Sequence, residues 1–457
     1  MAHQLFRTLI EFLEVFRPAL TEPGFNNMVV IFAGWVLTMG THAVTQTLVE
    51  TSVAERRHHE AYHRFFSRGT WDPDELGRLL FMRLLGWFAP ESPIRIVLDD
   101  TLAPKKGPHV FGIGSHLDAV RSTKLCRVFC FGHCWVMSAM LVPVPFSRRL
   151  WALPILFRLY RNKKECEKKN QPYQKKTELA REMLDVVFRW SGDRRVELAA
   201  DSAYCNDTVT RGLPASVVLF GAMRPDAVLT AEPAPPRPGR PGRHRKRGEL
   251  LPKPQALARD ESHPWLHCEA ELYGHTRRVA YKELRAQWYR ACGVRLLRIV
   301  IVKVDSGAIG LRVFFCTDST LPVVEILQGY ASRWSIETCF RNLKQLLGFA
   351  DSSARKKAAV QRTAPFVGFT YTLLVLWFVQ HAHNTDLAKP PVRPWYRHKQ
   401  GLSFEDVLRT ARRALFGRAV LVSSRHLDNL REISSRAPRI VRHRRARMAQ
   451  RSRRAAG

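Results

Sequence analysis

Four polar residues in the last third of the chain are spaced so that one face of a helix would carry all of them. Tyr330, Arg333, Glu337 and Lys344 have offsets of 0, 3, 7 and 14 positions. At about 100° per residue they fall at roughly 0°, 300°, 340° and 320°, within an arc of about 60°. An ordinary ion pair between Arg333 and Glu337, four residues apart, is the simpler alternative. The gathering of all four favours a site in which a carboxylate is flanked by two cations and a phenol.

Two further candidate carboxylates each follow a short apolar run. Asp99-Asp100-Thr101 follows Ile94–Leu98, and Asp201 follows Val196–Ala200. Both runs are typical of buried strands, so their acids would be held at rigid strand ends. Alternation along a strand puts Asp99 and Asp100 on opposite faces, so one of the two is expected to join the site. Asp207, after a turn-forming stretch, is expected to be a loop acid.

The elements that would hold these acids follow from the apolar patterns. Residues 1–90 show helical spacing, with Trp71-Asp72-Pro73-Asp74 typical of a helix start. From residue 91, strands alternate with helices, which predicts an α/β layer structure. Further strands are expected within 125–144, a run long enough for two, and at 265–272, 277–281, 294–304 and 310–317, with a hairpin turn at Asp305-Ser306-Gly307. Further helices are expected at 175–190, 323–347 and 365–381, the second anchored by Ile336, Phe340, Leu343 and Leu347.

The charge of the chain predicts a polyanionic partner. The 457 residues include 73 Lys and Arg against 40 Asp and Glu, a net charge of +33. Basic residues concentrate in the proline-rich segment 231–254 and in the last 27 residues, which hold ten arginines and one acid. Nucleic acid is the first expectation and an anionic membrane a distant second. With 46% hydrophobic residues, a wholly disordered polybasic protein is excluded.

Two other classes of site and location are not favoured. The longest apolar runs, 29–39 and 366–379, are shorter than a bilayer span and are expected to be buried helices, which places the protein in the cytoplasm. Nine scattered cysteines fit reduced thiols. Zinc at Cys126, Cys130, His133 and Cys134 is disfavoured because side chains in a strand alternate.

The motifs described above resemble a known family. The ungapped pattern Y-(2)-R-(3)-E-(6)-K of residues 330–344 resembles the signature of DDE transposases of bacterial insertion sequences, in the group named after insertion sequence four. Asp99-Asp100-Thr101 is similar to the first-aspartate motif of that group, usually Asp-Gly-Thr, and Ala200-Asp201-Ser-Ala-Tyr204 to its second. The resemblance covers about residues 90–385 and favours Asp99 over Asp100.

The resemblance implies a ribonuclease H-like catalytic core interrupted by a β-rich insertion. Asp99, Asp201 and Glu337 would bind two Mg²⁺ ions, with Mn²⁺ as a substitute, and such ions activate a nucleophile and stabilise the leaving oxygen of a phosphodiester. Tyr330, Arg333 and Lys344 would contact the DNA end. Trp265 or Trp288, from the insertion, would stack on a base pulled out of the duplex, although most tryptophans belong to a core.

The predicted layout has five parts, with a DNA-binding helical domain first. These are an N-terminal helical domain at 1–90, the core at 91–207, the β-rich insertion at 208–320, the rest of the core with the catalytic helix at 321–385 and a basic C-terminal region at 386–457. The expected activity is cut-and-paste transposition of double-stranded DNA by a bacterial, nucleoid-associated protein, acting as a homodimer on terminal inverted repeats. A nuclease that cuts without joining, or a DNA-binding repressor without catalysis, is the alternative.

Overall fold

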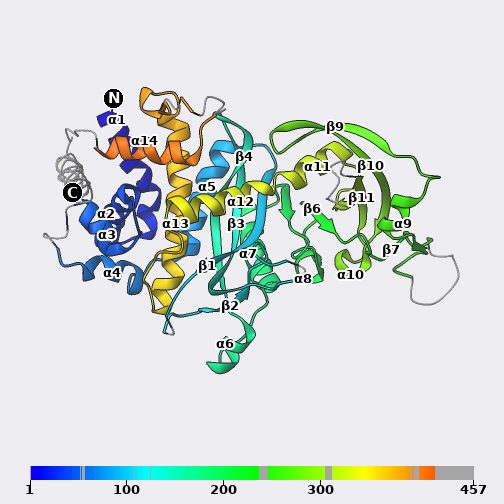
Figure 1. Ribbon diagram of the computed structural model, residues 1–457, viewed down its shortest axis with the longest axis horizontal. Helices are drawn as coiled ribbons and strands as arrows, with labels where there is room; N and C mark the ends of the chain where they lie inside the picture. The colour runs from blue at the N-terminus through cyan, green and yellow to red at the C-terminus, as the bar shows by residue number, and fades with distance from the viewer. Residues whose placement is uncertain are drawn as a thin grey trace, which may run out of the picture.

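The structure, a computed structural model, describes residues 2–51, 53, 57–107, 109–123, 125–235, 245–303, 311–391, 394–395 and 401–416. Along its longest axis the N-terminal helices lie at one end, a sheet covered by long helices lies in the middle, and a strand-rich part lies at the other end (Figure 1). The described chain is a mixed α/β protein with one large mixed sheet.

The strands join into one twelve-stranded sheet. Their bounds are β1 (Ile94–Pro104), β2 (Gly114–Leu117), β3 (Phe129–Val144), β4 (Ser147–Tyr160), β5 (Val196–Ala200), β6 (Val217–Met223), β7 (Leu229–Thr230), β8 (Leu250–Leu251), β9 (Leu266–Leu272), β10 (His275–Gln287), β11 (Leu296–Lys303) and β12 (Arg312–Cys316). The central strands lie in the order β4-β3-β1-β5-β6, with β1 parallel to β5 and β5 parallel to β6. Strands β12, β11 and β10 extend this sheet by antiparallel pairing.

The helices lie around and beside this sheet. Their bounds are α1 (Ala2–Glu11), η1 (Phe12–Ala19), α2 (Glu22–Leu37), α3 (Val44–Thr51), α4 (Glu60–Ser67), α5 (Pro73–Phe88), α6 (Lys163–Lys168), α7 (Lys176–Ser191), α8 (Asp207–Thr210), α9 (Pro254–Arg259), α10 (Tyr289–Cys292), α11 (Val323–Ala331), α12 (Trp334–Leu346), α13 (Lys357–Trp377), η2 (Phe378–Ala382), η3 (Asp386–Ala388) and α14 (Phe404–Phe416). The predicted helix start before α5 is confirmed: the carboxylate of Asp72 accepts a hydrogen bond from the Asp74 amide at the helix N-terminus.

A long apolar helix forms the centre of the packing. Within the described residues, one helix, Lys357–Ala382, is long and apolar enough to cross a membrane, but most of it is buried inside the protein. It packs on β4, α4 and α5, so the expectation of a buried helix at 366–379 is confirmed. The core is continuous from the N-terminal helices through the sheet to α14.

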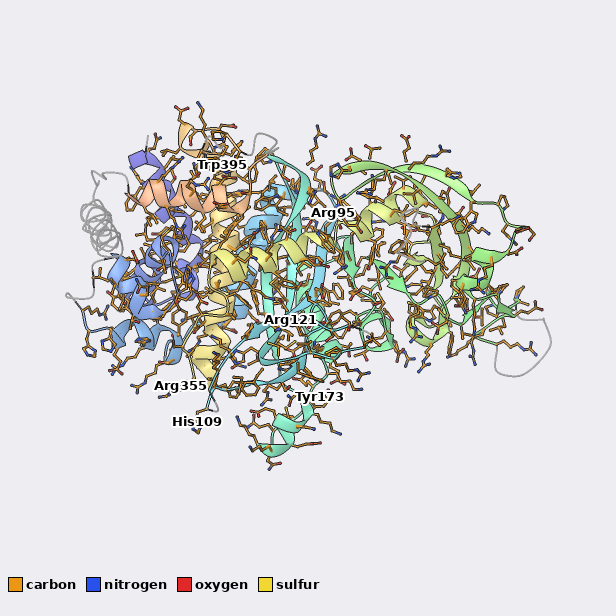
Figure 2. The ribbon with its side chains drawn as sticks, viewed as in Figure 1. Arg95, His109, Arg121, Tyr173, Arg355 and Trp395 are labelled. Carbon is orange, nitrogen blue, oxygen red and sulfur yellow. The ribbon has the colours of Figure 1, made fainter. Side chains whose placement is uncertain are left out.

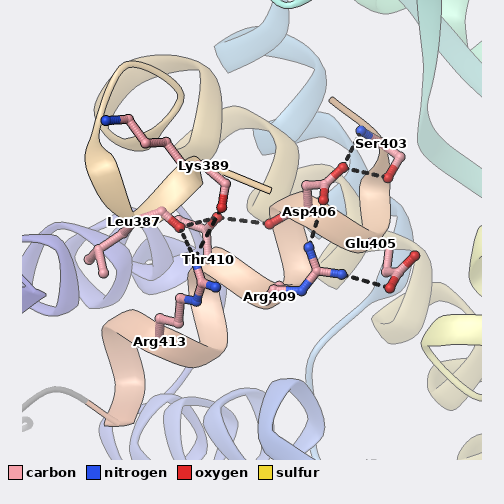
Figure 3. A network of polar contacts seen from close by, with 8 residues as sticks. All are labelled: Leu387, Lys389, Ser403, Glu405, Asp406, Arg409, Thr410 and Arg413. Carbon is pink, nitrogen blue, oxygen red and sulfur yellow. Dashed lines mark hydrogen bonds and ion pairs between the residues drawn. The ribbon is translucent and has the colours of Figure 1, made fainter. Parts of the chain in front are cut away.

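The last described helix ties the C-terminal part of the chain to the N-terminal helices. The buried carboxylate of Asp406 caps α14 by accepting hydrogen bonds from the amide and hydroxyl of Ser403 and also binds Arg409 (Figure 3). Arg412 donates to the carbonyl oxygens of Val36 and Thr38, at 2.7 and 2.8 Å, where α2 ends. Two chain segments that are distant in sequence therefore pack as one unit.

Most predicted strands are present, with two differences. The run 125–144 forms one long strand, β3, rather than two, because it pairs along its length with β1 on one side and with β2 and β4 on the other. Five strands were not predicted: β2, β4, β6, β7 and β8. The expected hairpin turn at 305–307, part of segment 231–254 and the basic tail from 417 onward lie outside the described residues. The division into domains stays a prediction.

Candidate active site

Asp99 and Asp201 lie side by side on neighbouring parallel strands. The register pairs Leu98 of β1 with Ala200 of β5, so the next residue on each strand, Asp99 and Asp201, is level with the other. Neighbouring strands are about 4.8 Å apart. Asp201 follows directly after β5, and its carboxylate accepts a hydrogen bond from the Ser202 amide at 2.6 Å. The predicted strand end is therefore confirmed for Asp201 but wrong for Asp99, which lies in the middle of β1 because that strand continues to Pro104 in its pairing with β3.

Glu337 comes from α12, which is fixed to the sheet by its apolar side. The predicted anchoring residues Ile336, Phe340, Leu343 and Leu347 are all buried, so this prediction is confirmed. The Ser335 hydroxyl also donates to the Leu150 carbonyl of β4, at 2.7 Å. Glu337 lies on the other side of the helix, and its side chain is about one-third exposed.

The helix predicted at 323–347 is interrupted at Ser332 and Arg333. Around this point the amide of Arg333 bonds to the Tyr330 carbonyl and that of Ile336 to the Arg333 carbonyl, both three residues back. Such three-residue bonds tighten the turn relative to an α-helix. The expectation of one continuous helix is therefore wrong, and Arg333 lies at the junction of α11 and α12.

Arg333 joins the acids of the site. Its Nη1 lies 2.8 Å from Asp99 Oδ2 and its Nη2 lies 2.8 Å from Glu337 Oε1. Asp201 is close enough to Arg333 to interact with it electrostatically. The guanidinium carbon also lies 5.8 Å from the centre of the Tyr330 ring. Arg333, a mostly buried side chain, thus brings Tyr330 and all three acids into one cluster.

Burial changes the acidity of Asp99. Desolvation raises the pKa of its carboxyl to about 7, against the opposing effects of Arg333 and of the Asp100 amide, while the nearby charges of Asp100 and Asp201 raise it further. The Asp100 amide donates to Asp99 Oδ1 at 2.8 Å. The cluster therefore contains more negative charge than one guanidinium balances, which is an environment suited to additional cations.

Asp100 faces the other way, into a separate polar network. Its carboxylate accepts hydrogen bonds from Lys176 Nζ at 2.6 Å and from the Tyr204 hydroxyl at 2.7 Å, and Cys134 Sγ lies 3.3 Å away. Asp99, rather than Asp100, lies with Arg333 and Glu337. The side chain of Asp100 fixes the middle of β1 against α7 and the segment after β5.

The donor set fits divalent metal ions by its chemistry. Carboxylate oxygens are the ligands that Mg²⁺ and Mn²⁺ take in proteins. In the described part of the chain, no group of three or more His, Cys, Asp or Glu side chains is gathered closely enough to hold an ion. At this cluster the guanidinium of Arg333 occupies a cation's position between Asp99 and Glu337.

The comparison with protein families identifies the kind of enzyme. A family model described as DDE superfamily endonuclease matches residues 15–287, more than half of the chain. This chain belongs to that family. The matched segment includes Asp99 and Asp201 and ends before Glu337, so the third acid is assigned here by geometry. No match was found among curated proteins.

The other residues predicted for the site of this DDE endonuclease lie further away. Lys344 is exposed near the end of α12, makes no ion pair with a described residue, and faces Asp118 and Cys130. Trp265 and Trp288 are half-buried against the core: Lys282 lies over the first ring, and Phe315 packs on the second.

Asp207 is not in a loop as predicted. It begins the short helix α8 and forms an ion pair with Arg211 at 2.7 Å.

Two exposed aromatic residues beside the cluster were not predicted from the sequence to be site residues. Trp334 follows Arg333 directly, and its ring centre lies 6.1 Å from that of Tyr273, in an edge-to-face arrangement. Tyr273 and Gly274 form the turn between β9 and β10, which arch over α11 (Figure 1). Tyr273 is therefore an aromatic residue of the strand-rich part that lies beside the site. The turn between the predicted strands 265–272 and 277–281 was the sequence signal that could have indicated it.

Replacing Asp99 by Asn should stabilise the metal-free endonuclease at alkaline pH. Because the folded pKa of about 7 exceeds the ordinary value of 3.8, the folded state favours the protonated carboxyl, and stability is lost as the pH rises through about 7. An uncharged Asn removes this loss. The free energy of unfolding of the variant should therefore exceed that of wild type by up to about 4 kcal/mol at pH 8 and by less than about 1 kcal/mol near pH 4. Thermal melts in EDTA at both pH values would measure the difference.

Asp100→Asn is the matched control for this experiment. It should destabilise the protein, because Lys176 would lose its carboxylate partner. Equal effects of the two substitutions, or a destabilising Asp99→Asn at pH 8, would contradict the assignment of Asp99 to the buried acidic cluster.

Proposed function

We propose that this DDE endonuclease is a cut-and-paste transposase of the group named after insertion sequence four. It would bind terminal inverted repeats, hydrolyse phosphodiesters at the transposon ends and join the 3′ ends to target DNA. The observation that carries the proposal is the convergence of Asp99, Asp201 and Glu337, from two neighbouring strands and a packed helix, on Arg333. Two strand acids plus a helix acid also support a ribonuclease H-like core.

The residues of the cluster divide into metal ligands and DNA contacts. Asp99, Asp201 and Glu337 would hold divalent ions, which supply nucleophile activation and stabilisation of the leaving oxygen. Arg333 has a forked set of donors that suits a phosphate oxygen pair, and the Tyr330 hydroxyl can donate to another. Lys344, exposed and without an ion-pair partner among described residues, supplies a point charge for a phosphate further along the DNA.

The exposed pair Tyr273 and Trp334 lies better for contact with a base than the tryptophans first considered. Trp265 and Trp288 are half-buried and have protein side chains on their rings. Trp334 and Tyr273 are 47% and 43% exposed beside Arg333. A base extruded from the duplex near the cleaved phosphate would reach these two rings first.

The partners and setting of the enzyme follow from this function. Double-stranded DNA is the substrate, and synapsis of two transposon ends requires at least two copies of the chain. The excess of 33 positive charges favours binding to a polyanion. A cytoplasmic, nucleoid-associated location follows from the substrate.

A strand-transfer experiment tests the proposal. Purified protein is incubated with a labelled duplex of the inverted-repeat end flanking the gene, a supercoiled target plasmid and Mg²⁺. Label joined covalently to the plasmid is the expected result. Cleavage of the labelled end without joining would indicate a nuclease of the same family. Binding without cleavage would indicate a DNA-binding repressor. Either result contradicts transposase activity.

A further inference from the structure

The β2–β3 hairpin, described over residues 114–123 and 125–132, has unusually many exposed apolar side chains. At its tip, Val120 is 95% and Leu125 is fully exposed. Along its strands, Leu117, Phe129 and Phe131 are each at least half exposed, and the register pairs Leu117 with Phe129. Strand β2 is at the edge of the sheet. Such a gathering on one hairpin marks an interaction surface.

The described residues of the tip are held by hydrogen bonds to one another. The Asp118 carboxylate accepts from the amides of Val120 and Arg121, both at 3.1 Å. The Thr123 amide donates to the Cys126 carbonyl at 2.8 Å, and the Cys126 amide donates to the Thr123 hydroxyl at 3.0 Å. A tip ordered in advance presents its apolar side chains at little entropic cost on binding.

The charge of the hairpin identifies the chemistry of its partner. Arg121 and Arg127 are exposed and form no ion pair with a described residue. The carboxylate of Asp118 already accepts hydrogen bonds from two amides of the tip. Apolar side chains flanked by arginines are the combination with which proteins insert into the minor groove of DNA and unstack a base step.

The hairpin continues the face of the candidate active site. Asp99 pairs with Met137 on β3, and the hairpin begins at Gly132, five residues further, which is about 17 Å along the strand. The exposed cation Lys344 of α12 faces Asp118 on the hairpin. In the view of Figure 2, Arg121 lies between α12 and β2. A duplex whose cleaved phosphate lies at the acid cluster would reach the hairpin within about one helical turn.

We propose that the β2–β3 hairpin is a DNA wedge: Val120 and Leu125 insert at a base step from the minor groove, and Arg121 and Arg127 bind the flanking phosphates. The proposal rests on the proposed action on DNA and adds a second contact that distorts the duplex. The energy of unstacking is offset by apolar contacts and by wrapping more DNA along α12. The hairpin is a binding surface and takes no part in the chemical step.

The test compares a tip variant with a matched control. Val120→Ser combined with Leu125→Ser removes both apolar side chains without changing charge, whereas Val228→Ser combined with Val294→Ser removes two other exposed valines in the strand-rich part. Affinity is measured by fluorescence anisotropy with the inverted-repeat duplex and a mixed-sequence duplex. Permanganate reactivity of thymines reports unstacked bases. Both assays are run on the full chain in Ca²⁺, so they do not depend on cleavage.

Wild-type protein and the control should make at least one thymine reactive, and the tip variant should lose that reactivity and bind about tenfold more weakly. A mismatch placed at the reactive position should restore its affinity. Arg121→Ala with Arg127→Ala should instead lower the salt slope by roughly 0.9 per lost phosphate contact. Circular dichroism melts check that the variants fold.

Other results would overturn the wedge. The first is that wild-type protein binds DNA but makes no thymine reactive. The second is that wild type and tip variant show equal binding and equal reactivity. The third is that the tip variant shifts from dimer to monomer in sedimentation while its permanganate pattern is unchanged. The last result would make the hairpin an interface between two copies of the chain. If the wedge results hold but wild type neither cleaves nor joins DNA in Mg²⁺, the proposed function fails and the wedge stands.

Discussion

Glu337→Gln is expected to lower the rate of DNA cleavage by at least about a thousandfold. The substitution keeps the volume of the side chain and removes the charge that the helix contributes to the acid cluster. Binding of the inverted-repeat duplex should stay within about threefold of wild type, because the apolar side of α12 that fixes the helix is untouched. Gel assays of cleavage in Mg²⁺ and anisotropy of binding in Ca²⁺ would measure the two effects separately.

Glu325→Gln is the matched control for this prediction. Glu325 is an exposed carboxylate in the first turn of α11, about one and a half turns before Tyr330, and it lies outside the acid cluster. The control should cleave at the wild-type rate. Normal cleavage by Glu337→Gln, or equal loss in both variants, would remove Glu337 from the catalytic residues. Asp201→Asn is expected to behave like Glu337→Gln.

The parts of the site that were predictable from sequence are those that depend on local periodicity. Strand β5 follows the predicted run Val196–Ala200, and the apolar stripe of α12 is buried as its spacing indicated. Both patterns reflect one element lying on one core, which a short window of sequence contains. For the same reason the break between α11 and α12 was missed: the apolar pattern continues through it, and a tightened turn leaves little trace in residue types.

The choice between Asp99 and Asp100 shows what local pattern does not contain. Alternation predicts that the two carboxylates point to opposite faces, but it does not say which face carries the site. The family motif favoured Asp99. In the structure, the partners that engage Asp100 are Lys176 and Tyr204, which are 76 and 104 residues away in sequence. Information about the face of a strand resides in such tertiary contacts.

Sheet pairing was the least predictable level of the fold. Residues 208–320 were expected as an insertion, yet β6 within them pairs in parallel with β5, and β12 pairs with β6. The strands of the strand-rich part therefore continue the central sheet. Strand β6 itself was not predicted. Pairing partners of a strand depend on packing across the whole molecule, so even a recognised apolar run does not reveal its neighbour.

Arg333→Met is expected to raise the affinity of the DNA-free protein for Mn²⁺ by about tenfold or more. The guanidinium lies 2.8 Å from both Asp99 and Glu337, so an incoming cation must displace it or share the carboxylates with it. Removing the positive charge leaves the acids of the cluster without a compensating group, and an added cation then gains more energy by binding. Isothermal titration or the spin-resonance signal of free Mn²⁺ would measure the affinity without any need for catalysis.

The same substitution should weaken binding of the DNA end and reduce cleavage, since Arg333 is the proposed phosphate contact next to the acids. Tighter metal binding together with weaker DNA binding is the combination that separates this role from general damage to the fold. Arg341→Met, an exposed arginine on α12, should change neither quantity by more than about twofold. If Arg333→Met bound Mn²⁺ no more tightly than wild type and Arg341→Met, the guanidinium would not compete with cations for the carboxylates of Asp99 and Glu337.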